Sequence, residues 1–162
     1  MKKVLITGGC RGIGLAAARK FYENGFLTFI TYNSTLSDQK EAKKLLPYAT
    51  ALRLDVTDSS QVDALFQRHD FDIVVNNAGT SLHALLTDTS DSDFDSIMRV
   101  NLYGTFYVCR AALPHMIKRQ KGSIVNVSSI WALTGGAAEC AYSAAKAGIL
   151  GLTKALAKEA SP

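Results

Sequence analysis

Residues 3–14 read KVLITGGCRGIG, a short hydrophobic run that leads into a glycine-rich turn. A run of this kind, rich in β-branched and aliphatic residues, is typical of a buried parallel strand. Apolar residues then recur at helical spacing from Ile13 to Phe21, and Gly25 marks the expected end of that helix. A strand, a glycine turn and a helix in this order form a setting in which backbone amides and a helix N-terminus hold a pyrophosphate. The stretch therefore predicts a dinucleotide-binding unit at the start of the chain.

The same alternation of strands and helices continues beyond this unit. Strands are predicted over residues 26–32, 51–54, 71–75 and 123–127, and helices over residues 37–46, 59–68, 93–118 and 140–160. The pattern predicts the α/β class, with a Rossmann-type doubly wound parallel sheet and helices on both faces, in one domain over residues 1–162. Pro114 lies within the long helix and is expected to bend or shorten it. In such sheets ligands bind beyond the carboxyl ends of the strands.

The end of the second predicted strand bears on which cofactor the chain prefers. NAD-binding folds place an acidic residue there, about twenty residues beyond the glycine turn, to bind the ribose 2′-hydroxyl. Here the strand ends at Asn33, no acid follows before Asp38, and Arg11 projects from the turn. A missing anion and an available cation favour NADP over NAD. The glycine spacing itself, Gly-x-x-x-Gly-x-Gly, differs from the general Gly-x-Gly-x-x-Gly fingerprint, and Arg11 could also be a solvated loop arginine.

Composition and charge narrow the class of protein. The chain has 162 residues and a formal net charge of +4, and its lysine clusters are accompanied by no nucleic-acid recognition motif. No apolar run approaches the ~18 residues of a membrane span, and the N-terminus lacks the features of a signal peptide. We therefore expect a cytoplasmic protein with no nucleic-acid or membrane partner.

Three widely spaced cysteines suit neither a disulfide framework nor a metal site and are expected to be buried thiols: Cys10, Cys109 and Cys140.

Tyr142 and Lys146 are the first candidates for catalysis. They are four residues apart, so a helix through both places them on one face. A phenol is a poor acid at neutral pH, but a fixed cation beside it favours the phenolate and makes it usable for proton transfer. Ser129 adds a hydroxyl at the end of the fifth strand, 13 residues before the tyrosine. Asn101 interrupts the apolar stripe of the long helix and is either a structural amide or a polar relay.

Across its whole length the chain resembles the short-chain dehydrogenase/reductase family, through TGGCRGIG at 7–14, LDV at 54–56, NNAG at 76–79 and four single residues. By that resemblance Ser129 binds the substrate carbonyl and Tyr142 donates a proton as hydride arrives from the nicotinamide. Lys146 assists the tyrosine and holds the ribose, and Asn101 orders a water that replaces the proton. The cofactor-binding residues implied are Gly8, Cys10, Arg11, Gly12, Ile13, Gly14, Asn33, Asp55, Val56, Asn77, Ala78, Gly79, Tyr142 and Lys146.

Within the family, the glycine turn with Arg11 is similar to NADP-dependent 3-oxoacyl-carrier-protein reductases, which implies a small-molecule or carrier-bound carbonyl substrate. A narrower similarity, carried by SSIWALTGGAAECAYSAAK at 128–146, is to reductases of 5-aminopentanone-modified elongation factor P. Under that alternative, Glu139 faces the substrate mouth and pairs with a cationic group. The competing interpretation of Glu139 is a solvated loop carboxylate.

Family members are usually longer than this chain, which stops where a sixth strand is expected. The resemblance therefore implies a Rossmann domain that is incomplete at its C-terminus and lacks the last two strands of the family. The fifth strand and final helix are then expected to expose apolar surface and an unpaired edge. Two functions stay open: an NADP-dependent carbonyl reductase, or a truncated, non-catalytic nucleotide-binding remnant or partner subunit. A homo-oligomer is expected by resemblance.

Overall fold

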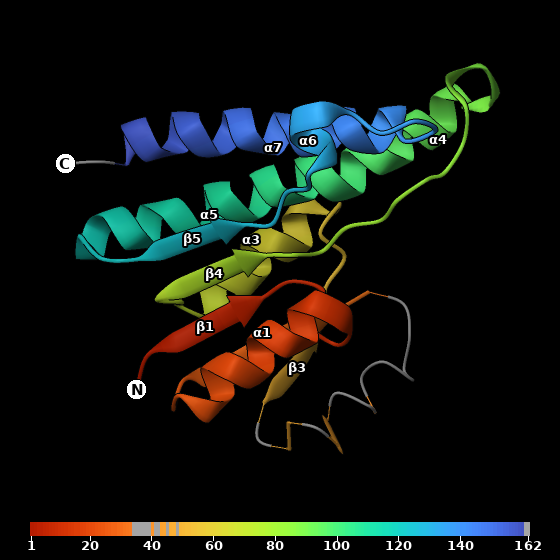
Figure 1. Ribbon diagram of the computed structural model, residues 1–162. Coiled ribbons are helices and arrows are strands. Elements are labelled where there is room, and N and C mark those ends of the chain that lie inside the picture. Colours follow the sequence, from red (N-terminus) through yellow and green to blue (C-terminus); the bar gives the residue numbers. More distant parts are fainter. Residues whose placement is uncertain (34–39, 41–42, 45, 48, 161–162) are drawn as a thin grey trace.

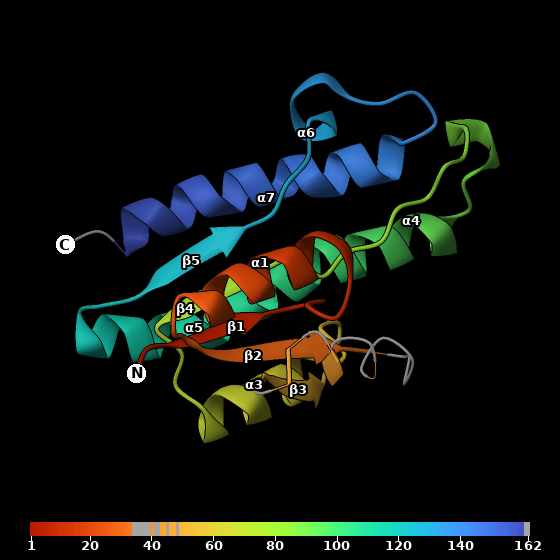
Figure 2. The ribbon, with the colours of Figure 1, turned by 60° about the horizontal axis from the view of Figure 1, so that its bottom comes forward.

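A computed structural model describes residues 1–33, 40, 43–44, 46–47 and 49–160 of the chain. Its centre is a five-stranded sheet with strand order β3-β2-β1-β4-β5, in which every neighbouring pair is parallel. Figure 2 shows this order from one edge of the sheet to the other. The strands are β1 (Lys3–Ile6), β2 (Leu27–Tyr32), β3 (Thr50–Arg53), β4 (Ile73–Asn76) and β5 (Ser123–Asn126).

Helices cover both faces of the sheet, as the sequence predicts (Figure 1). Successive side chains of a strand point to opposite faces. In β1, Val4 and Ile6 pack in a hydrophobic cluster with Ala18 of α1 (Gly12–Glu23). Leu5, between them, packs in the cluster that holds the residues of α3 (Ser59–Arg68) and α5 (Gly104–Arg119). All three strand residues are fully buried, so the central strand is hydrophobic throughout.

The long helix predicted over residues 93–118 is observed in three consecutive parts. It begins as α4 (Asp91–Met98), passes through a π-helical turn, η2 (Arg99–Tyr103), and continues as α5. A capping box between Ser90 and Asp93 fixes its start. Pro114 does not shorten the helix, which runs five residues beyond it to Arg119. Proline has no amide hydrogen to donate to the carbonyl of Arg110, four residues earlier, but both residues are exposed, so that carbonyl lies on the solvent side of the helix.

The last long helix, α7 (Cys140–Glu159), packs against α4 and the π-helical turn through Ala141, Ala145 and Ile97. Two short elements are not predicted by the sequence patterns: the 3₁₀ turn η1 (Leu86–Asp88) and helix α6 (Trp131–Thr134). Among the described helices, none combines the length and hydrophobicity that crossing a membrane requires.

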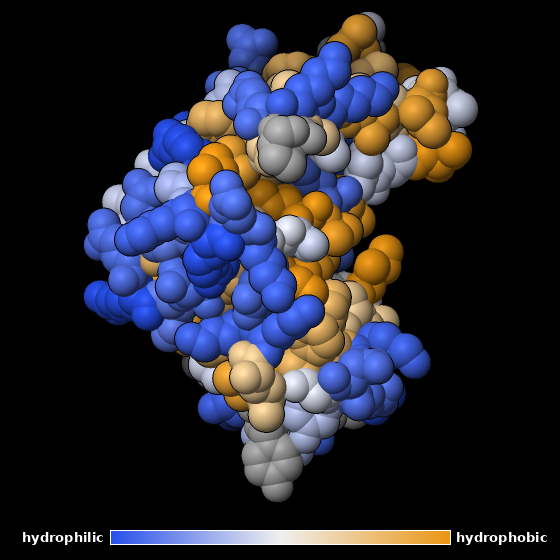
Figure 3. All heavy atoms as spheres, turned by 90° about the vertical axis from the view of Figure 1, so that its left-hand side faces the viewer, coloured by the Kyte–Doolittle hydropathy of each residue, from blue (hydrophilic) through white to orange (hydrophobic). Residues whose placement is uncertain are grey.

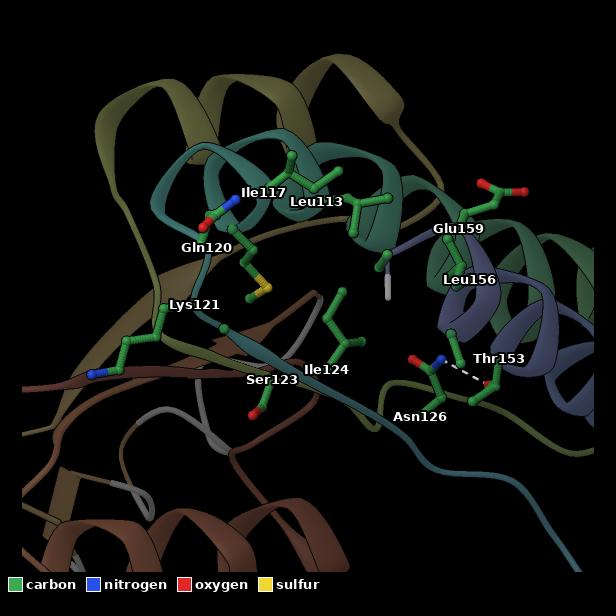
Figure 4. Close-up of a pocket in the computed structure, with 14 residues that line it drawn as sticks. Leu113, Ile117, Gln120, Lys121, Ser123, Ile124, Asn126, Thr153, Leu156 and Glu159 are labelled. Carbon is green, nitrogen blue, oxygen red and sulfur yellow. Dashed lines mark hydrogen bonds between the residues drawn. The ribbon is translucent and has the colours of Figure 1, made fainter. Parts of the chain in front are cut away.

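β5 forms one edge of the sheet and leaves apolar side chains exposed, as expected. Val125 is 49% exposed and Ile117 of α5 is 54% exposed. A groove of about 550 Å³ lies between α5, the start of β5 and α7, lined by Leu113, Ile117 and Leu156 among others (Figure 4). Figure 3 views the molecule from the side on which the strands begin. Hydrophobic residues are visible there between two hydrophilic regions of the surface.

Most predicted elements are present with shifted ends, and α3 matches its predicted range. The helix predicted over residues 37–46 lies largely outside the described residues. The prediction of three buried thiols is wrong for one cysteine: Cys10 and Cys109 are buried, but Cys140 is exposed. The reason is that Cys140 is the first residue of α7, and its side chain does not share the face on which Ala141 and Ala145 pack.

Candidate active site

The glycine turn joins β1 to α1 and needs its glycines for two different reasons. Gly8 and Gly12 have φ angles of +62° and +54°, in the left-handed region that L side chains rarely adopt. Gly14 has no such angle, but a β-carbon there would collide with the Gly8 carbonyl and stand 2.5 Å from the Asn77 amide nitrogen. The turn is therefore packed tightly against the end of β4.

Hydrogen bonds from the end of β4 hold this turn in place. The Thr7 hydroxyl accepts from the backbone amides of Asn77 and Ala78, both at 3.0 Å. The Asn77 carboxamide donates to the carbonyls of Thr7 and Gly8, both at 3.1 Å. Thr7 begins the TGGCRGIG motif, but the sequence predictions gave it no role, because its hydrogen-bond partners come from a segment about seventy residues away. The Asn77 side chain thus fixes the backbone of the glycine turn through two hydrogen bonds.

The start of α1 is suited to an anionic group. Arg11 is the N-cap residue, yet it makes no side-chain cap bond, and the first turn of the helix contains no acidic residue. The first backbone amides of a helix have no intrahelical acceptor, and the helix dipole adds partial positive charge there. Glycines that permit close approach, next to an uncapped helix start, fit a pyrophosphate.

A cleft of about 600 Å³ opens beside this turn, at the carboxyl ends of the strands. Thr31, Val100 and Thr80 also line it, together with most of the predicted cofactor residues. Asp55 directs its carboxylate to Thr57, whose backbone amide and hydroxyl donate to it at 2.9 and 2.8 Å, so this carboxylate shapes the turn after β3. The predicted residues on the cleft wall are Gly8, Cys10, Arg11, Gly12, Ile13, Asn33, Asp55, Val56, Asn77, Ala78 and Gly79.

Asn101 lies in the π-helical turn, where it is completely buried. Its amide nitrogen donates to the carbonyls of Thr80 at 2.8 Å and Ile97 at 3.0 Å. Its oxygen has no hydrogen-bond partner among the described residues, and it points to Gly79, where a β-carbon would stand 2.6 Å away. A buried polar atom without a partner is unusual and marks a place where a water or ligand can bind. Single π-helical turns within α-helices are frequent at functional sites, and Asn101 lies in one beside the cleft wall.

Lys146 is buried, with 4% of its surface exposed. Its ammonium donates to the Val127 carbonyl at 3.0 Å and lies 5.6 Å from the centre of the Tyr142 ring. Burial, which disfavours the charged form, lowers the pKa of Lys146. The Ser128 hydroxyl donates to the Lys146 carbonyl at 2.9 Å and so ties the end of β5 to α7. Val127 was not among the predicted site residues, because its contribution is a backbone carbonyl.

Ser129 and Glu139 flank the short helix α6. The Ser129 hydroxyl accepts from the backbone amide of Trp131 at 3.2 Å, at the start of that helix. Glu139 precedes α7, and its side chain is 18% exposed, so the carboxylate is partly buried rather than fully solvated. One of its carboxylate oxygens lies 3.9 Å from the His83 ring, and the other is buried without a described partner.

The chain is similar to known proteins over nearly all of its length. A family model described as short chain dehydrogenase matches residues 2–162. A 3-oxoacyl-[acyl-carrier-protein] reductase of Chlamydia pneumoniae is 40% identical, and one of Thermotoga maritima is 39% identical, over 98% of this chain and 67% and 68% of theirs. A reductase of the same name from Bos taurus is 37% identical over 98% of this chain and 69% of its own. The chain thus spans about two thirds of the length of these relatives, and it belongs to the short-chain dehydrogenase family of oxidoreductases.

Proposed function

We propose that this chain takes part in reducing the ketone of a 3-oxoacyl thioester to an alcohol, with NADPH as the hydride source and Tyr142 as the proton donor. The observation that carries the proposal is the buried Lys146 ammonium. It is held beside the Tyr142 ring and lies 3.5 Å from the position of a β-carbon on Gly79, a residue of the cleft wall. A cation placed next to a phenol at the edge of a dinucleotide-sized cleft suits acid catalysis on a carbonyl.

In this proposal the residues of the cleft bind and orient the dinucleotide. The glycine turn and the start of α1 hold the pyrophosphate, Asp55 and Val56 flank the adenine, and Arg11 approaches the ribose 2′-phosphate. The bound cofactor supplies the hydride, which no protein side chain can provide. A nicotinamide dinucleotide with the extra phosphate is favoured because Asn33 replaces the acid that would bind a free 2′-hydroxyl.

The catalytic roles are divided among four side chains. The Ser129 hydroxyl donates a hydrogen bond to the substrate carbonyl, and the Tyr142 hydroxyl transfers its proton to the same oxygen. The Lys146 ammonium stabilises the phenolate that remains. The Asn101 oxygen, for which the described residues supply no donor, accepts a hydrogen bond from a water through which the phenol recovers its proton. These groups act through position and charge.

Two observations bear on the substrate. The relatives reported above carry the name 3-oxoacyl-[acyl-carrier-protein] reductase, which favours a carrier-bound 3-oxoacyl thioester. The partly buried carboxylate of Glu139 favours a second candidate, a ketone that carries an amine, as on aminopentanone-modified elongation factor P. A buried carboxylate oxygen without a donor is unfavourable until a donor arrives. We therefore treat Glu139→Gln as the variant that separates the two substrate classes.

NADPH consumption with acetoacetyl thioester tests the proposal directly. We expect turnover by the wild type and a loss of at least ~100-fold in kcat for Tyr142→Phe, the scale of general-acid catalysis. Binding of NADPH, followed by its fluorescence, is expected to persist in that variant. Equal turnover by both proteins would overturn the role of Tyr142. NADPH binding without any turnover of the ketones tried would favour the alternative function, a non-catalytic nucleotide-binding chain or partner subunit.

We also propose that the chain forms homo-oligomers through α5 and the π-helical turn that precedes it. Tyr103 and Phe106 are 46% and 41% exposed, and the Arg110 guanidinium lies 5.3 Å from the Phe106 ring. Exposed aromatic residues next to an arginine are typical of interface centres. Light scattering is expected to give more than the monomer mass, and Phe106→Glu is expected to reduce it.

A further inference from the structure

We propose that Arg53, at the end of β3, binds the ribose 2′-phosphate of the cofactor together with Arg11. This inference rests on the proposed function and names a specificity-determining residue for it. Arg53 lies outside the motifs that identify the family, and the sequence gives it no special status. Its position in the fold is what singles it out.

The pairing of β3 with β2 places Arg53 directly beside residues that line the cleft, although Arg53 itself does not line it. In the parallel register Arg53 is opposite Tyr32, the last residue of β2, and its Nε donates to the Asn33 carbonyl at 3.2 Å. Tyr32 and Asn33 both line the cleft. Asn33 is also where a chain that prefers NAD would carry its acid. The Arg53 guanidinium therefore lies beside Asn33, the position at which the acidic residue of NAD-binding folds is absent.

Arg53 projects to the face of the sheet on which α1 lies. Its neighbour two residues earlier, Ala51, packs in the cluster with Val4, Ile6 and Ala18 on that face. The next residue, Leu54, packs in the cluster on the opposite face. Alternation along the strand therefore places the Arg53 side chain on the same side as Ala51. Arg11 follows β1 and Arg53 ends β3, and these two strands flank β2 on its two sides.

The bond to Asn33 also prepares the guanidinium for a phosphate. This bond uses Nε. The two terminal nitrogens of the guanidinium have no partner among the described residues and are available to a ligand. Two parallel N–H groups match two phosphate oxygens, and a guanidinium fixed at Nε loses less conformational freedom on binding. The nearest carboxylate in sequence, that of Asp55, is engaged by Thr57 and does not compete.

Calorimetric titration with two probes tests the inference without relying on turnover. Adenosine 2′,5′-bisphosphate carries the 2′-phosphate, and 5′-AMP lacks it. We expect Arg53→Gln to weaken bisphosphate binding by about 10- to 100-fold, as for loss of a charged hydrogen-bond partner, with 5′-AMP binding unchanged. Arg53→Lys, which keeps the charge but loses the paired N–H groups, is expected to fall between. Arg68→Gln, an exposed arginine at the far end of α3, is the control for net charge and is expected to have no effect.

Each outcome has a distinct meaning. If the wild type prefers the bisphosphate and Arg53→Gln keeps that preference, the role of Arg53 is wrong while the proposed NADPH dependence stands. If Arg53→Gln weakens the binding of both probes equally, Arg53 has only a structural role in joining β3 to the end of β2, and the inference is also overturned. If the wild type does not distinguish the probes, the proposed preference for NADPH falls and the role of Arg53 falls with it.

Discussion

Gly79 and Asn101 are packed so closely that a β-carbon on the glycine would stand 2.6 Å from the asparagine oxygen. Gly79 follows β4, and Asn101 lies in the π-helical turn between α4 and α5. Their contact brings the Asn101 oxygen, which has no hydrogen-bond partner within the described part of the chain, to the wall of the cleft. Three predicted site residues, Gly79, Asn101 and Lys146, therefore meet at one point although they are far apart in the chain.

Gly79→Ala is predicted to disturb this point. The added methyl group overlaps Asn101 and forces either the amide or the strand end to move, and overpacking of this kind typically costs about 1–3 kcal/mol. Urea denaturation should report this loss of stability, and any turnover should fall with it. Gly151→Ala is the matched control, because a β-carbon there meets nothing within 4 Å and alanine is favoured over glycine inside a helix by about 1 kcal/mol. Equal stability of Gly79→Ala and the wild type would contradict the packing.

Lys146→Met is predicted to change how stability depends on pH. Burial lowers the pKa of Lys146 from its ordinary value of 10.5. Between the lowered folded-state pKa and 10.5, the unfolded chain binds more protons, so wild-type stability rises with pH through that window. The variant lacks this group, and the free energy of unfolding of the wild type minus that of Lys146→Met should therefore increase from neutral pH toward 10.5.

Urea titrations at several pH values measure this difference. Lys154→Met, in the same helix α7 but at an exposed position, is the control and should give a difference that does not vary with pH. A flat profile for Lys146→Met would show that the ammonium is not desolvated in the folded protein.

Asn126→Ala is predicted to be strongly destabilising, because this side chain connects three elements. Its oxygen accepts from Asn76 at 2.8 Å and from the Cys109 thiol at 3.5 Å, and its nitrogen donates to Thr153 of α7 at 2.9 Å. Each buried group left without a partner costs about 1–3 kcal/mol, so the loss should exceed the effect of one ordinary hydrogen bond. Asn24→Ala, which removes a single exposed bond to Lys20, is the comparison. Similar stabilities of the two variants would argue against the network.

The three cysteines are predicted to react with iodoacetamide at very different rates. Burial raises the pKa of Cys109 to about 11, although its hydrogen bonds with Asn126 and Asn76 oppose the shift, so little thiolate forms. Cys10 is also buried, and Cys140 is exposed. Mass spectrometry of the native protein should show rapid labelling at Cys140 alone, and all three should react in urea. Rapid labelling of Cys109 in the folded protein would contradict its burial.

How far the sequence determines the fold depends on how local the determining interaction is. Hydrophobic runs between turns locate the strands, and α3 matches its predicted range because Asp58 caps it by accepting from the amides of Ser60 and Gln61. The π-helical turn at Asn101 is different. Nothing in the residues around it distinguishes a π turn from an α turn, and its amide is held by the Thr80 carbonyl, from a distant segment.

By itself the sequence determined the α/β class, the parallel sheet and the glycine turn, because periodicity and turn chemistry are local properties. The resemblance to the family singled out the candidate catalytic side chains. Only the tertiary structure decided what those side chains contact. The Val127 carbonyl that holds Lys146 and the Asn33 carbonyl that orients Arg53 belong to the backbone just beyond the ends of β5 and β2. Such partners carry no signal in residue type, since every residue offers the same carbonyl. The register of β3 on β2 brings Arg53 to Asn33, and the packing of α7 beside β5 brings Lys146 to Val127.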